Sequence, residues 1–207
     1  QVANLAEEAI YYIGGNSKEK VSFSNAATYN LVDGKVVKTK LKSDGEFDEK
    51  INKFWARKKI TLPNVSEGSI IEFEYNLESD GLGSLENWAF QMGIPVVYSE
   101  FKTIIPEYFK YKALMRGYMT PKFETNKNTK TVNISSKEKS EGRVTATTFT
   151  NSQFVYDETT SIYVLENLPA LKDEAYVNNI KNFTASIEHE LTSIEYPNEH
   201  IRNLSTS

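Results

Sequence analysis

Apolar and polar residues alternate along much of the chain, which is the pattern of strands that bury one face and expose the other. Residues 69–78 are the clearest case. Their apolar set is Ile71, Phe73, Tyr75 and Leu77, and their polar set is Glu72, Glu74, Asn76 and Glu78. Residues 183–191 repeat the pattern, with one face made of Phe183, Ala185, Ile187, His189 and Leu191. Both segments predict half-buried antiparallel strands.

Turn residues mark where strands pair. Residues 28–32 and 35–39 flank Asp33-Gly34. An Asp-Gly pair accepts the two positive φ angles of a type I′ turn, whose twist matches that of the flanking strands. The sequence therefore predicts a tight hairpin here.

Further strands are expected at residues 54–61, 88–92, 96–105, 108–116, 130–135, 143–150 and 161–165. Helix is scarce, because only residues 2–13 and 47–55 could form one or two turns each, and neither is strongly amphipathic. Residues 120–142 are rich in Lys, Asn, Thr and Ser. They predict an exposed edge hairpin with a mobile tip, and Val132 and Ile134 favour this interpretation over a disordered insertion.

About ten strands with little helix predict an all-β fold, an antiparallel β-sandwich. No linker forces a split, so the sequence predicts a single domain over residues 1–207. The chain begins with Gln1. A first residue other than Met predicts a processed or truncated piece, and the family resemblance given below implies that residues 1–20 are an incomplete entry segment of a domain truncated at its N-terminal side.

Composition removes several classes of function. The 207 residues include no Cys and two His, so a thiol nucleophile, a Cys-ligated metal and a three-His site are excluded for this chain. There are 24 Lys and Arg against 28 Asp and Glu, a net charge of −4, which does not favour nucleic-acid binding. No apolar run approaches the length of a membrane-spanning helix. We expect no cofactor and no metal site.

The glutamates of residues 69–78 are one candidate for chemistry. Residues two apart on a strand are separated by roughly 6.6 Å, near the spacing of glycosidase carboxylates. A hydrolase that uses Glu72, Glu74 or His189 is therefore one hypothesis. An alternating row of glutamates is also typical of a solvated sheet face, and we favour that interpretation.

His189 lies on the apolar side of its strand pattern, where it could be a base or a ligand. Glu188 and Glu190 point to the opposite face and cannot orient it. We interpret His189 as a hydrogen-bonded core or boundary histidine, and we expect no catalytic residue in the chain.

Aromatic residues concentrate between residues 88 and 118. They could stack on sugar rings or peptide side chains, although such residues more often fill a core. The candidate binding residues are Trp88, Tyr98, Glu100 and Tyr108. An independent carbohydrate- or peptide-binding module is the alternative function that they suggest.

A series of short motifs is more specific than any of these features. LPNVSEGSIIEFEY at residues 62–75 is followed by NWAFQ at 87–91, IPV at 94–96, IPE at 105–107 and LPALKDE at 168–174. This order resembles family 3857 of domains of unknown function, which precedes a transglutaminase-like domain in exported proteins of Bacteroidetes. The likeness covers residues 24–191.

The resemblance implies a β-sandwich, an exported and periplasmic location, and a downstream transglutaminase-like domain as partner. That domain would carry a papain-like Cys-His-Asp set, whose nucleophile this chain cannot supply. The expected function is a non-catalytic accessory domain that packs against the downstream domain or presents substrate to it, so the chain itself is not expected to be an enzyme. Peptide or glycan remains a possible further partner.

Overall fold

The structure, a computed structural model, describes residues 7–13, 19–81, 85–140, 146–171, 183–195 and 202–203. Within these ranges the chain forms antiparallel strands, and its helical structure there consists of one 3₁₀ turn, η1 (Ser43–Gly45). The all-β, antiparallel class predicted from the alternation is confirmed. No helix in the described ranges has the length and apolar character that crossing a bilayer requires.

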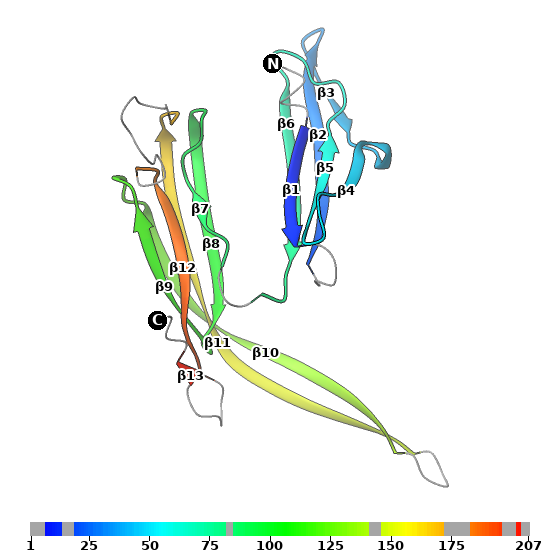
Figure 1. The fold of residues 1–207 in the computed structure, drawn as a ribbon, viewed down its shortest axis with the longest axis vertical. Helices are drawn as coiled ribbons and strands as arrows, with labels where there is room; N and C mark the ends of the chain where they lie inside the picture. Colours follow the sequence, from blue (N-terminus) through cyan, green and yellow to red (C-terminus); the bar gives the residue numbers. More distant parts are fainter. Residues whose placement is uncertain are drawn as a thin grey trace. The chain divides into compact units, whose positions relative to one another are not determined.

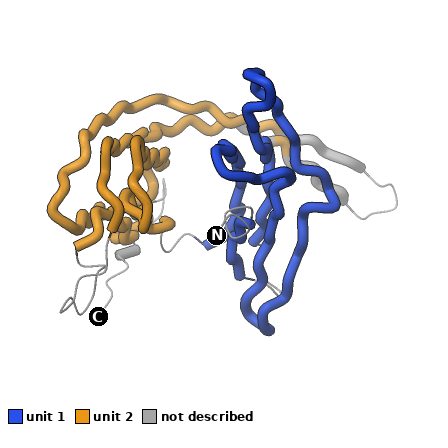
Figure 2. Tube along the Cα trace, turned by 90° about the horizontal axis from the view of Figure 1, so that it is seen from above, with its two compact units in different colours: residues 1–82 blue, residues 83–207 orange. Residues whose placement is uncertain are grey.

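The chain divides into two compact units, residues 1–82 and residues 83–207 (Figure 2). The prediction of one domain over residues 1–207 did not anticipate this division. Around the boundary the sequence shows Asp80-Gly81 and Gly83-Ser84, which are ordinary turn signals, and no long Pro- or Ser-rich linker. Each unit has a buried cluster of its own.

Unit 1 contains two three-stranded antiparallel sheets (Figure 1). One has the order β1-β5-β4 and the other β3-β2-β6. Their strands are β1 (Glu7–Ile13), β2 (Lys20–Val32), β3 (Lys35–Lys40), β4 (Glu46–Lys50), β5 (Trp55–Thr61) and β6 (Ile70–Glu78). Ile60 of β5 and Ala26 of β2 belong to the same buried cluster, with Phe23 and Phe73 packed against it. The two sheets therefore share a core.

The hairpin between β2 and β3 has the turn that its sequence predicts. Asp33 has φ of 50° and Gly34 has φ of 74°, as a type I′ turn requires. Val32 pairs with Lys35 directly across the turn. The alternation in β6 is also confirmed, since Ile71 and Phe73 pack against the core of unit 1 while the intervening Glu72 is exposed.

The predicted helical turns at residues 2–13 and 47–55 are wrong where the structure describes them. Residues 7–13 form β1, which pairs along its whole length with β5. Residues 46–50 form β4, which pairs with the other edge of β5. The Ile and Tyr content of β1 favours a strand, and pairing with β5 satisfies backbone groups that a one-turn helix would leave open.

Unit 2 also contains two sheets. One has the order β10-β11-β8, and in the other β12 pairs with β7, β9 and β13. The strands are β7 (Trp88–Ala89), β8 (Val96–Pro106), β9 (Phe109–Arg116), β10 (Lys122–Ser140), β11 (Ala146–Leu168), β12 (Ser186–Ile194) and β13 (Arg202–Asn203). The core contains Phe90, Tyr163, Leu168, Ala185 and Ile187. The core therefore lies between the two sheets, because β11 belongs to one sheet and β12 to the other.

A long hairpin dominates the second half of unit 2 (Figure 1). β10 and β11 pair without a break from Lys122↔Val164 to Ser140↔Ala146. Residues 120–142 were expected to form a hairpin by themselves. Instead they supply one strand, because their partner lies in residues 146–164. The last two residues of the predicted hairpin, 141 and 142, lie outside the described residues.

Candidate functional site

Trp88 belongs to the core of unit 2. Its indole stacks on Phe101, with ring centroids 5.6 Å apart and an interplanar angle of 13°. The indole Nε1 donates a hydrogen bond to Ser99 Oγ at 3.1 Å. One face of the indole is therefore covered by Phe101.

The other three predicted binding residues lie at two separate places, one on β8 and the other just beyond its end. The Tyr98 hydroxyl donates to the Glu100 carboxylate on the exposed face of β8, and this bond raises the pKa of Tyr98. Tyr108 follows the end of β8. Its ring centroid lies 5.7 Å from that of Phe154 and 6.1 Å from that of Tyr156. Tyr98 and Tyr108 are separated by roughly 30 Å of strand. The four predicted residues do not form one site.

The glutamates of β6 have polar partners on an exposed surface. The Tyr29 hydroxyl donates to Glu72 Oε2 at 2.6 Å, and Asn25 Nδ2 donates to Glu74 Oε2 at 2.7 Å. Both bonds link β6 to the neighbouring strand β2. Such an arrangement is that of a solvated sheet face, which is the interpretation favoured from the sequence.

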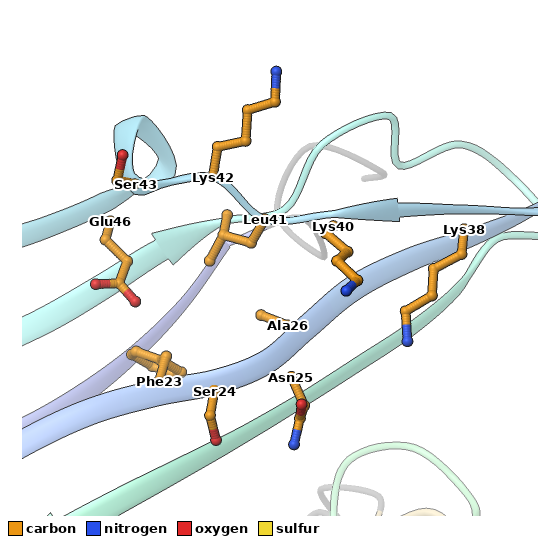
Figure 3. Close-up of a pocket in the computed structure, with 10 residues that line it drawn as sticks. All are labelled: Phe23, Ser24, Asn25, Ala26, Lys38, Lys40, Leu41, Lys42, Ser43 and Glu46. Atoms are coloured by element: carbon orange, nitrogen blue, oxygen red, sulfur yellow. The ribbon is translucent and has the colours of Figure 1, made fainter.

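Unit 1 has a groove of about 390 Å³ at the point where β3 leaves β2 (Figure 3). Three lysines line it: Lys38, Lys40 and Lys42. They do not converge, because Lys42 points away from the other two (Figure 3). Lys38 lies over the Tyr29 ring, 4.8 Å from its centroid, and a hydrogen bond with Tyr29 raises the pKa of Lys38. The groove therefore lacks the focused charge of an anion site.

Unit 2 has a hollow of about 340 Å³ between its two sheets. We call it the inter-sheet hollow. Its lining includes Thr103, Lys127, Asp157, Thr159, Ser161 and His189. The residues come from β8, β10 and β11 on one side and from β12 on the other, so the hollow continues the space that the apolar core fills elsewhere.

His189 is 6% exposed and lies between the rings of Phe101 and Tyr163, whose centroids are 5.7 and 6.2 Å from its own. The predicted core position of His189 is confirmed. The described residues provide no hydrogen-bond partner for Nδ1 of His189, so the predicted hydrogen bonding of this ring does not come from them at that atom. Thr103 Oγ1 is also buried without a hydrogen-bond partner among the described residues. Thr103 was not predicted as a site residue.

Burial lowers the pKa of His189 from its usual value. Between the lowered pKa and about 6.5, the unfolded chain binds a proton that the folded chain does not, so stability falls as the pH falls through this window. We expect His189→Gln to remove that pH dependence. Urea unfolding of both proteins between about pH 5.5 and 7.5 measures it. The burial argument would be contradicted if the free energy of unfolding of the variant changed with pH as steeply as that of the parent, and if NMR gave the His189 imidazole of the parent a pKa at or above about 6.5.

No group of three or more His, Asp and Glu side chains within the described ranges is arranged to hold a metal ion. The candidate chemistry described above is that of hydrogen-bonded pairs and of the inter-sheet hollow.

The comparison with known families identifies the chain. Residues 2–139, well over half of the sequence, match DUF3857, a domain of unknown function. The chain belongs to the DUF3857 family. The family that was predicted from the motifs at residues 62–174 is thus confirmed, although the motif at 168–174 lies outside the matched residues. No curated protein matches this DUF3857 chain.

The fold of this DUF3857 chain is also found in a solved structure. A crystal structure of a "putative protease" from Parabacteroides distasonis ATCC 8503 is similar, with a TM-score of 0.60 and 15% sequence identity. The similarity covers 92% of the DUF3857 chain and 34% of the other chain. At this identity the likeness concerns the fold, and the DUF3857 chain spans about a third of its structural relative.

Proposed function

We propose that this DUF3857 chain is the non-catalytic accessory part of a larger protease-like protein. The observation that carries the proposal is the unequal coverage of the structural relative. Nearly the whole DUF3857 chain corresponds to 34% of a protein described as a "putative protease", so that protein has ample length for another domain. The proposed role is to pack against such a domain or to present substrate to it.

The sequence supports the non-catalytic part of the proposal. The chain has no Cys, so it cannot supply the nucleophile of a papain-like or transglutaminase-like site. Its buried His189 lies between the aromatic rings of Phe101 and Tyr163, and the exposed carboxylates of β6 bind neutral side chains. A nucleophile hydrogen-bonded to a base, the minimum for covalent catalysis, is not formed by these groups.

The finer form of the proposal rests on the motif resemblance at residues 62–174. It makes the partner a downstream transglutaminase-like domain of the same protein, and it places the protein outside the cytoplasm, in the periplasm. A catalytic domain of that class would bring its own Cys, His and Asp, while this chain would contribute contact surface.

Assays of the whole gene product and of residues 1–207 alone test the proposed function. We expect the whole product to hydrolyse peptides or to transfer glutamine acyl groups to amines, and to lose that activity on alkylation with iodoacetamide. Residues 1–207 alone should be inactive in both assays. Activity in the purified 207-residue chain, or a whole product that contains no Cys, would overturn the proposal.

A further inference from the structure

β10 and β11 continue past the end of the third strand of their sheet (Figure 1). β8 pairs with β11 as far as Glu158, and the Glu107 N–H then donates to the Asp157 carbonyl at 2.8 Å. Beyond this point β10 and β11 pair with each other and with no other described strand. We call residues 130–140 and 146–156 the arm. A two-stranded ribbon by itself is only marginally stable in water, so the arm would be stabilised by a further strand.

The side of β11 that β8 leaves uncovered is called here the β11 edge. In an antiparallel strand the N–H and C=O of one residue point to the same side, and that side alternates along the strand. The Asp157 N–H donates to Glu107 Oε1 and its carbonyl accepts the Glu107 N–H, so the backbone groups of Asp157 point toward the β8 side. The pairing of β10 with β11 has no register shift along the arm. The residues whose backbone groups point to the β11 edge are therefore Thr147, Phe149, Asn151, Gln153 and Val155.

The β11 edge lacks the residues that keep sheet edges from pairing. Natural edge strands are protected by charged side chains, above all lysine, and by proline. Residues 146–156 contain no charged residue, no proline and no glycine. Each of the other described edge strands longer than two residues carries at least two charged side chains. On the other edge of the arm, for example, β10 carries Lys130, Lys137 and Lys139. The β11 edge is thus open to pairing with another strand.

A second copy of the chain fits the β11 edge. Two copies related by a two-fold axis present the same surface to each other, and two such strands run antiparallel. A charged edge would bring like charges together in this pair, whereas residues 146–156 carry none. The lengths also agree. When residues 146–156 of the two copies lie side by side, β8 of each copy starts to pair only beyond the end of the partner's β11, so β8 does not compete for the edge.

We propose that two copies of the chain associate through the β11 edge, so that the two arms form one four-stranded antiparallel sheet across a two-fold axis. The contact is a ladder of backbone hydrogen bonds along roughly 35 Å of strand. Its area is small beside that of permanent dimers, so we expect a dissociation constant of about 10–100 μM. This inference does not rest on the proposed accessory role.

Sedimentation velocity of the 207-residue chain tests the association, over a range of about 1–500 μM that brackets the expected dissociation constant. We expect a monomer–dimer equilibrium without larger species, because the charged β10 edge opposes further growth. A chain that stays monomeric over this range, or that forms open-ended assemblies, overturns the proposal. A monomeric chain whose residues 146–156 exchange amide hydrogens more slowly within the whole gene product would assign the edge to another part of that protein, which also overturns it.

Two proline substitutions locate the contact. Gln153 and Asn133 are exposed and lie directly opposite each other in the ladder, so each points its backbone N–H to its own outer edge. Gln153→Pro removes an N–H from the β11 edge and Asn133→Pro removes one from the β10 edge, while the bonds between β10 and β11 remain. We expect Gln153→Pro to weaken the dimer by about tenfold or more, and Asn133→Pro to dimerise as the parent does. Equal dimerisation of the two variants overturns the proposal.

Two lysine substitutions test the same contact without the conformational restriction of proline. The Ser135 hydroxyl donates to Asn151 Oδ1 at 2.7 Å, and the two residues are cross-strand partners. Asn151→Lys and Ser135→Lys both remove this hydrogen bond, but only Asn151→Lys places lysines on the β11 edge, at the middle of residues 146–156. It should weaken the dimer by about tenfold, and by less in about 1 M NaCl, which screens the repulsion. Ser135→Lys should dimerise as the parent does, and equal dimerisation of these two variants contradicts the two-fold contact.

Discussion

Phe90→Ala is expected to lower the free energy of unfolding of unit 2 by about 3–5 kcal/mol, the usual range for removing a buried Phe side chain. Phe90 is 2% exposed and belongs to the core cluster with Tyr163 and Ile187. Its backbone N–H donates to the Ala185 carbonyl at 2.8 Å, so the phenyl ring is held where the entry to β12 meets the core.

Tryptophan fluorescence can follow each unit by itself, because Trp55 lies in unit 1 and Trp88 in unit 2. In a Trp55→Phe background, Phe90→Ala should shift the urea transition that Trp88 reports. Val97→Ala, at a position 77% exposed in the same unit, should change it by less than about 0.5 kcal/mol. A loss from Phe90→Ala no larger than that of the control would show that the assigned core does not stabilise unit 2.

Gly117→Ala is expected to destabilise unit 2 by about 2–4 kcal/mol. Gly117 has φ of 83°, a left-handed conformation that costs a residue with a Cβ about 1–2 kcal/mol. A Cβ at this position would also lie 2.8 Å from Ala185 N and 2.9 Å from Thr184 C. These are backbone atoms in the connection that leads into β12, so relieving the clash requires the chain itself to move.

The control for Gly117→Ala is Gly34→Ala. Gly34 has φ of 74°, but a Cβ there would meet nothing within 4 Å. The free energy of unfolding of this variant should fall only by the cost of a left-handed backbone conformation, about 1–2 kcal/mol. Trp55 fluorescence reports it, since Gly34 lies in the β2–β3 turn of unit 1. Equal losses in the two variants would mean that the backbone contact of Gly117 contributes nothing.

Local patterns in the sequence predicted local structure well. Asp33-Gly34 predicted both the position and the type of the β2–β3 turn, and alternation predicted which face of β6 and β12 is buried. The pairing partners could not be predicted, since alternation indicates the faces of a strand and not its neighbours. Residues 122–140 show this clearly, because they pair with residues 146–164 and not with each other.

The candidate site was predicted only in part. The inward position of His189 follows from its strand pattern, and the structure bears it out. The hollow beside it was missed, although a signal was present, because alternate residues of β11 change from Leu165 and Tyr163 to the polar Ser161, Thr159 and Asp157. That signal requires the strand to be followed through residues 146–168, whereas the sequence analysis expected separate strands at 143–150 and 161–165.

The central claim is the proposed accessory role, in which this DUF3857 chain contacts the rest of a larger protein. Hydrogen–deuterium exchange of residues 1–207, measured alone and within the whole gene product, tests it most directly. The account predicts that a contiguous surface exchanges more slowly in the whole product, as it would when covered by a catalytic domain. Identical exchange of every peptide in the two forms would contradict the account.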